Sequence, residues 1–316
     1  MNTHVPLRSI LLATNLTDIE WLFPYTCSLA EESGAHVTVL HVIPSLNAFS
    51  IDLAGMPYYR PDEAIAEAKK HLNDFCTRTC TAKTTAEVVA VDGAPADAIL
   101  ATASQIHADL LVMGTRSNRG VDKWLHGSVA EAVLRSSPIP VITVGPHARG
   151  VAAQGRPIKS ILFATSLKGR TTDIENANLT LRWAERLHGH LTLLHVVEGS
   201  GGDDLAQERR CEALERELRA LVPEDAFRKT LVDARVRSGR PSREILTAAT
   251  HTDLIALGAL RSPVLGRFAP EGTLYKVLAE AHCPVVTLHS EHGKTKVLDP
   301  AKHAVAQAPE TTATQH

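Results

Sequence analysis

The chain is poor in aromatic residues, in cysteine and in net charge, and each shortage narrows the class of protein. Only 13 of its 316 residues are aromatic (six Phe, four Tyr and three Trp), so its core must be built mainly from aliphatic side chains. Five cysteines are an odd number in a chain of this length, which fits a reducing compartment better than a disulfide framework. A formal charge of −2 gives no overall reason to expect a nucleic acid partner.

Long apolar runs are absent as well. No run approaches the roughly 18–20 residues that a membrane span needs, and residues 1–6 lack the charged and apolar regions of a secretion signal. Cys76 and Cys80 stand four residues apart, but no second Cys or His pair has a spacing that would complete a metal site. We therefore expect a cytoplasmic protein that makes no contact with membranes and holds no structural metal.

What the chain does contain is an internal repeat. Five blocks recur in the same order about 145 residues apart; for example, 9–15 is repeated at 160–166 and 37–43 at 191–197. This period is too long for a solenoid unit, so each copy is a whole domain.

The repeat divides the chain into four parts. We expect domains at 1–145 and 157–289, joined by a linker at 146–156 that contains proline and glycine. Residues 290–316 are polar and rich in Ala, Thr, Lys and Gln, which predicts a disordered tail.

Each copy alternates short apolar runs with segments of helical length. Runs that are apolar throughout, such as 110–113, suit strands buried on both faces. This alternation predicts an α/β fold in which a parallel sheet is covered by helices on both faces. In the first copy, strands are expected at 8–14, 36–43, 86–91, 109–114 and 140–144.

The stretch after the fourth expected strand has the features of a phosphate-binding loop. Gly114 would let the chain turn sharply off the strand. Gly127 and Ser128 stand just before an amphipathic helix, where free backbone N–H groups and the serine hydroxyl can hold phosphate oxygens. Three basic residues between 116 and 123, Arg116 among them, add positive charge. The alternative is ordinary turn and N-cap chemistry, which uses the same residue types.

The spacing in this stretch resembles the nucleotide-binding loop of the universal stress protein family. That loop has Gly, two residues, Gly, nine residues, then Gly-Ser or Gly-Thr. Here Gly114 is followed by two residues, Ser117, nine residues and then Gly127-Ser128. The strand end at 40–42, Leu-His-Val, is similar too. The resemblance covers roughly 7–145 and 157–289, which makes the chain a tandem member.

The resemblance implies two doubly wound domains, each with a five-stranded parallel sheet in the order 3-2-1-4-5. In ATP-binding members, adenine and ribose lie at the ends of strands one and two, and the triphosphate lies along the loop. Two residues depart from the pattern, because Asn15 replaces an aspartate and Ser117 replaces the second glycine. By position, the implied nucleotide-binding residues are Ala13, Thr14, Asn15, Val42, Met113, Gly114, Arg116, Ser117, Gly127, Ser128 and Val129.

The second copy departs further from the pattern. Without a gap, Gly258 matches Gly114 and Glu271 matches Gly127. A carboxylate at the helix start would compete with phosphate for the same N–H groups and repel its charge. Shifting the alignment by one residue restores Gly272-Thr273 but lengthens the spacing. The hypothesis is that the N-terminal copy binds ATP and the C-terminal copy is degenerate.

The leading interpretation is an adenine nucleotide-binding regulatory protein of the stress response, with ATP as ligand, with or without Mg²⁺, and a regulatory protein partner. One alternative is an interaction or scaffold protein that binds no nucleotide, and another is a slow ATPase. No nucleophile is matched to a base in the sequence, so we do not expect an enzyme. His41 and His195 recur at strand ends, where a structural role is expected.

The last strands suggest how the copies associate. Family resemblance implies pairing of last strands across a two-fold axis, so 140–144 and 284–288 are expected to pair within one chain as an internal pseudo-dimer. Whether two chains also form a homodimer stays open.

Overall fold

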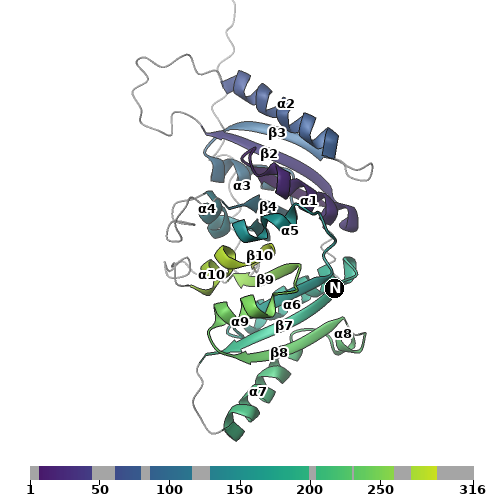
Figure 1. Cartoon of the computed structure of the whole chain (residues 1–316), viewed down its shortest axis with the longest axis vertical. Helices are drawn as coiled ribbons and strands as arrows, with labels where there is room; N and C mark the ends of the chain where they lie inside the picture. Colours follow the sequence, from purple (N-terminus) through teal and green to yellow (C-terminus); the bar gives the residue numbers. More distant parts are fainter. Residues whose placement is uncertain are drawn as a thin grey trace, which may run out of the picture.

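The computed structural model describes residues 7–44, 61–79, 86–115, 129–198, 204–229, 231–259 and 272–289. Its centre is a single ten-stranded sheet with the order β3-β2-β1-β4-β5-β10-β9-β6-β7-β8 (Figure 1). The first half has the predicted order 3-2-1-4-5, and the second half repeats it in the opposite direction along the sheet. Among the described residues, no helix is long and apolar enough to cross a membrane.

The strands fall within a few residues of the predicted positions. Neighbouring strands within each half are parallel, as the alternation of strand and helix requires. The strands are β1 (Ser9–Thr14), β2 (His36–Pro44), β3 (Ala86–Gly93), β4 (Leu110–Gly114), β5 (Val141–Val144), β6 (Ser160–Thr165), β7 (His190–Val197), β8 (Val232–Ser238), β9 (Leu254–Ala259) and β10 (Val285–His289).

Helices cover both faces of the sheet (Figure 1). One face carries α1 (Ile19–Ser33), α2 (Pro61–Thr79), the 3₁₀ helix η3 (Pro146–Ala148), α5 (Arg149–Ala152), α6 (Arg170–Arg186), α7 (Asp204–Arg219) and α8 (Glu224–Arg228). The other face carries α3 (Pro95–Gln105), α4 (Val129–Ser136), α9 (Pro241–Ala248) and α10 (Thr273–Glu280). Each of the two cores contains side chains from both copies. Apart from Phe23 and Phe163, the largest fully buried side chains are Ile and Leu, which confirms the aliphatic core.

The same local signal starts one helix in each copy. Pro95 and Pro241 occupy the first turn of α3 and α9, where the missing N–H of proline costs nothing. Gly93 and Gly239 precede them with φ of 157° and 147°, values that side chains rarely adopt. The repeated Gly-x-Pro block therefore encodes the turn from the third strand into the next helix.

The two halves join through their last strands. β5 pairs antiparallel with β10, with Val141 opposite Thr287 and Thr143 opposite Val285. This confirms the expected pairing of 140–144 with 284–288. Because the pairing is antiparallel, the copies are related by an approximate two-fold rotation, which places α1 and α6 on the same face of the sheet.

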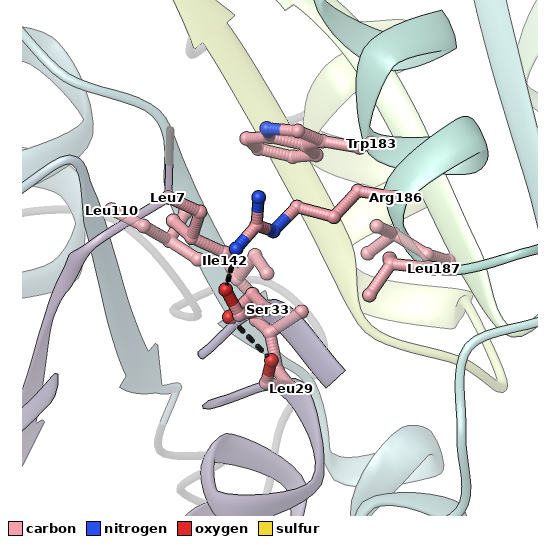
Figure 2. A pocket seen from close by; sticks show the side chains of 9 residues that line it. Leu7, Leu29, Ser33, Leu110, Ile142, Trp183, Arg186 and Leu187 are labelled. Atoms are coloured by element: carbon pink, nitrogen blue, oxygen red, sulfur yellow. Dashed lines mark hydrogen bonds between the residues drawn. The ribbon is translucent and has the colours of Figure 1, made fainter. Parts of the chain in front are cut away.

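Polar contacts reinforce this junction where α1 and α6 end. Figure 2 shows a cavity there, lined mainly by apolar side chains, with the Arg186 guanidinium donating to the carbonyl of Ser33 at the end of α1. Nearby, Lys159 Nζ donates to Glu32 Oε1 at 2.8 Å and to the Leu187 carbonyl at 2.7 Å. A cation near the last carbonyls of a helix is favourable for its dipole.

The segment expected as a linker is folded. Residues 146–152 form η3 and α5, and both Ala148 and Ala152 are fully buried. The connection between the copies is therefore packed against α1 rather than spanning solvent. The expected disordered tail, 290–316, lies outside the described residues.

Candidate functional site

The carboxyl ends of β1, β2 and β4 form the edge at which a ligand site is expected. In parallel α/β sheets, ligands bind beyond the carboxyl ends of the strands where the strand order reverses, and β1 lies next to β4 at this point. Ala13 pairs with Met113, and Thr14 pairs with His41. The structure thus brings Ala13, Thr14 and Met113 together, with Gly114 next in the chain.

The remaining predicted residues are placed less fully. Val42 is buried on the same edge but pairs with β3, one strand further out. Val129 begins α4 and is 38% exposed. The predicted phosphate contacts Arg116, Ser117, Gly127 and Ser128 lie outside the described residues, as does Glu271 of the second copy.

Asp18 is a residue at this edge that the predicted site did not include. Its carboxylate is 5% exposed and turns back from the start of α1 instead of capping the helix. Thr14 Oγ1 donates to Asp18 Oδ1 at 2.5 Å, and the Asn15 N–H donates to the same oxygen at 3.0 Å. A carboxylate therefore does lie at the end of strand one, although Asn15 replaces the aspartate of the family pattern.

Gly114 is required for space and not for a turn. Its φ is not positive, so the expected sharp turn at this residue is wrong. A Cβ at position 114 would lie 3.0 Å from Asp18 Oδ2, closer than almost any real Cβ contact. The absence of a side chain lets the buried carboxylate lie against the end of β4.

Asn15 closes a local turn. Its Oδ1 accepts from the Thr17 N–H at 3.0 Å and from Thr17 Oγ1 at 2.6 Å, which is the side-chain geometry of an Asx turn. The preceding strand end is held in turn by Leu16, whose N–H donates to Thr14 Oγ1 at 3.1 Å and whose φ is 74°. The acceptor oxygen of Asn15 is thus used within the loop.

The two strand-end histidines are structural, as expected. His41 Nδ1 lies 2.9 Å from the Thr14 carbonyl oxygen, and His195 Nδ1 lies 2.9 Å from the Thr165 carbonyl oxygen. Since a carbonyl only accepts, Nδ1 carries the proton in both rings. Each histidine therefore ties the end of the second strand to the end of the first.

The second copy rebuilds the same carboxylate contact from a different position. Thr165 Oγ1 donates to Asp173 Oδ1 at 2.7 Å, and the Gly169 N–H donates to Asp173 Oδ2 at 3.1 Å. The partner lies eight residues after the threonine here, against four in the first copy. Asp173 is 6% exposed, so both copies bury one carboxylate at this edge.

A further difference lies at the glycine that ends the fourth strand. A Cβ at Gly258 would lie 3.2 Å from Asn176 Nδ2, whereas Gly114 faces a carboxylate. Asn176 is 2% exposed, and its amide nitrogen has no hydrogen-bond partner. The first copy therefore presents an acceptor at this glycine and the second copy a donor.

The described residues contain no group of three or more His, Cys, Asp or Glu side chains that could hold a metal ion. Asp18 is thus a single carboxylate at the edge. Mg²⁺ is commonly bound by one or two carboxylates together with substrate phosphates, so this edge would need a phosphate ligand to hold it.

Comparison with known proteins agrees with this architecture. The model of the universal stress protein family matches residues 7–145 and again 158–289. The stress response protein NhaX of Bacillus subtilis is 34% identical over 85 residues, which are 27% of this chain and 47% of that protein. A universal stress protein of Methanocaldococcus jannaschii is 29% identical over 146 residues, which are 43% of this chain and 81% of that protein.

A solved structure extends the likeness to both halves at once. The crystal structure of a universal stress protein from Archaeoglobus fulgidus has a TM-score of 0.64 with this chain at 21% identity, and the match covers 89% of this chain and 96% of that one. At this identity the likeness supports the fold alone. Because the family model matches the chain twice over most of its length, this chain belongs to the universal stress protein family, with two copies of the family domain.

Proposed function

We propose that the N-terminal copy binds an adenine nucleotide, ATP, at the carboxyl ends of β1 and β4, and that occupancy regulates a protein partner in the cytoplasm during the stress response. The observation that carries this proposal is the position of Gly114. It is the first residue of the Gly-x-x-Ser…Gly-Ser pattern, and it follows the residue of β4 that pairs with Ala13 of β1.

The chemistry of the edge suits a nucleoside. A buried carboxylate that already accepts from Thr14 and Asn15 can accept further hydrogen bonds from ribose hydroxyls through its remaining lone pairs. The first turn of α4, which begins at Val129, leaves N–H groups without partners in the helix, and these favour phosphate. Glu131 in that turn is bonded to Arg135 at 2.6 Å, which lowers its repulsion of an anion.

We propose binding without catalysis. Asp18 Oδ1 already accepts two hydrogen bonds, so it is poorly placed to take a proton from an attacking water. Mg²⁺, where it accompanies ATP, would be held mainly by the phosphates. The second copy is proposed to bind nucleotide weakly or not at all, because Asn176 lies against Gly258 and Glu271 stands at the helix start.

A scaffold that binds no nucleotide is the second candidate. It is favoured by one specific observation, the engagement of Asn15 Oδ1 by Thr17, which removes an acceptor from the ribose side of the edge. The experiment below separates the two functions.

Calorimetric titration of the full chain with ATP, ADP and AMP tests the proposal. We expect one site per chain and a loss of affinity of at least about tenfold in Gly127→Asp, because a carboxylate would oppose the phosphates. The matched variant Gly272→Asp places the same charge at the second copy and should leave affinity unchanged. Two sites, or loss only in Gly272→Asp, would overturn the assignment to the first copy.

The same samples separate the alternatives. An absence of binding by the unmodified chain would support the scaffold function. Phosphate release by the unmodified chain above that of Gly127→Asp would instead support the slow ATPase.

A further inference from the structure

The segment that connects the copies reaches the nucleotide edge of the first copy through Arg149. Arg149 is the first residue of α5, and its Nη2 donates to the Thr115 carbonyl at 3.3 Å. Its guanidinium carbon lies 4.8 Å from the centroid of the Trp21 ring on α1, so an aromatic face fixes the plane of the fork. Thr115 follows Gly114 directly, and its N–H donates to Val144 at the end of β5.

The other end of the same segment reaches the second copy. Gly145 lies so close to α10 that a Cβ there would be 2.7 Å from the Leu278 carbonyl oxygen. Two residues on, the His147 ring meets the His282 ring edge to face, with centroids 5.7 Å apart. Leu278 lies within α10 and His282 two residues after its end. One packed segment therefore touches the nucleotide edge of one copy and a helix of the other.

Unused hydrogen-bonding capacity makes the Arg149 contact capable of a second arrangement. Thr115 is 4% exposed, and its Oγ1 has no hydrogen-bond partner; the same holds for Arg149 Nε and Trp21 Nε1. Buried polar groups of this kind are destabilising as they stand. A small displacement of Thr115 that brought its oxygen to a donor would be favourable, so two arrangements of similar free energy are expected.

We propose that Arg149 is a positioning residue that couples nucleotide occupancy of the first copy to the position of α10 in the second. A ligand that contacts Gly114 displaces Thr115, Arg149 follows through its hydrogen bond to the Thr115 carbonyl, and the rigid η3–α5 segment transmits the shift to Leu278 and His282. The coupling rests on the proposed nucleotide binding, and it explains how a copy without its own ligand can present a signal. Coupling requires an element whose two states both sites influence, and η3–α5 is that element.

Hydrogen exchange of the full chain, read by mass spectrometry with and without saturating ATP, tests the coupling. In the unmodified chain, ATP should slow exchange at 110–115 and change exchange at 273–288 by about twofold or more. Arg149→Gln should retain the first effect and lose the second. Arg149→Lys, which keeps the charge but not the planar fork, should give a smaller effect on α10.

Arg156 provides a matched control, because it is an exposed arginine in the same connecting segment; Arg156→Gln should behave as the unmodified chain. An ATP effect on α10 that persists in Arg149→Gln, or that is absent from an unmodified chain that binds ATP, refutes the coupling.

A second measurement without nucleotide separates this inference from the proposed function. His282→Ala removes an exposed ring contact in the second copy and should change exchange at 110–115 in the unmodified background, but not in the Arg149→Gln background. No effect at 110–115 in either background refutes the coupling whether or not ATP binds. Failure of ATP to bind in calorimetry refutes the proposed function alone.

Discussion

The buried hydrogen bond between Thr14 and Asp18 gives the sharpest energetic prediction. Asp18→Ala leaves the Thr14 hydroxyl and the Asn15 N–H without their acceptor at a place where Asp18 is only 5% exposed. Each buried donor that loses its partner costs about 1–3 kcal/mol, so the substitution should lower the free energy of unfolding by about 2–5 kcal/mol. That is a large share of the roughly 5–15 kcal/mol of a typical domain.

A double-mutant cycle isolates the pair. Thr14→Val, Asp18→Ala and the double variant should give a coupling of about 1.5–3 kcal/mol, the range for hydrogen bonds to charged groups. The corresponding cycle of Thr165→Val and Asp173→Ala should give a similar value, because that bond is 2.7 Å long and Asp173 is 6% exposed. Both cycles are measured by urea unfolding of the full chain.

The chain contains a control with the same spacing as the first pair. Lys229 Nζ donates to Asp225 at 2.9 Å, also four residues apart, on an exposed helix. Solvent screening should leave that pair without measurable coupling. If the Thr14–Asp18 coupling is as small as that of Asp225–Lys229, burial does not strengthen this bond and the reasoning is refuted.

Three further predictions follow from single sites. Gly114→Ala should cost about 1–3 kcal/mol by overpacking against the buried carboxylate 3.0 Å away, whereas Gly150→Ala, with nothing within 4 Å, should not destabilise; chemical unfolding compares them, and equal effects contradict the steric argument. Burial raises the pKa of Cys283 to about 12, so the thiol stabilises the fold fully below its unfolded pKa of about 8.5, and this contribution falls by about 1.4 kcal/mol per pH unit above it. Cys283→Ala should therefore flatten the loss of stability in urea between about pH 9 and 10; an unchanged slope counts against it. Arg186→Met removes the donor to the last turn of α1 and should cost about 1–2 kcal/mol; an unchanged melting temperature would contradict a role in joining the copies.

The topology was largely predictable because it depends on patterns that survive in the sequence. Runs such as 110–113 are apolar on every side chain, which suits only strands covered on both faces. The repeat then fixed how many such strands exist, and the family resemblance supplied their order. The pairing of β5 with β10 followed from the same resemblance.

The carboxylate at the strand-one edge was not predictable, because its position depends on backbone conformation. Asp18 reaches Thr14 only because Leu16 adopts a φ of 74°, and Asp173 reaches Thr165 past Leu167 with a φ of 57°. Leucine is not a residue that marks positive φ in a sequence. The different spacing in the two copies also hides the contact from any comparison of the repeats.

The packed connection was missed for a related reason. Glycine and proline in 146–156 predicted a linker, but Ala148 and Ala152 stand four residues apart and are both fully buried. Two alanines at helical spacing are too weak an apolar pattern to outweigh the glycines around them.

The antiparallel junction of β5 with β10 has a consequence for how the copies could diverge. Two separate identical chains meeting through such strands would form homodimers, and any change in one partner would appear in the other. Tethering makes the effective concentration of each half for the other very high, so an asymmetric pair forms without competition from symmetric pairs. The second copy was thereby released to replace its acceptor at the glycine by Asn176, while every molecule still keeps one unaltered half.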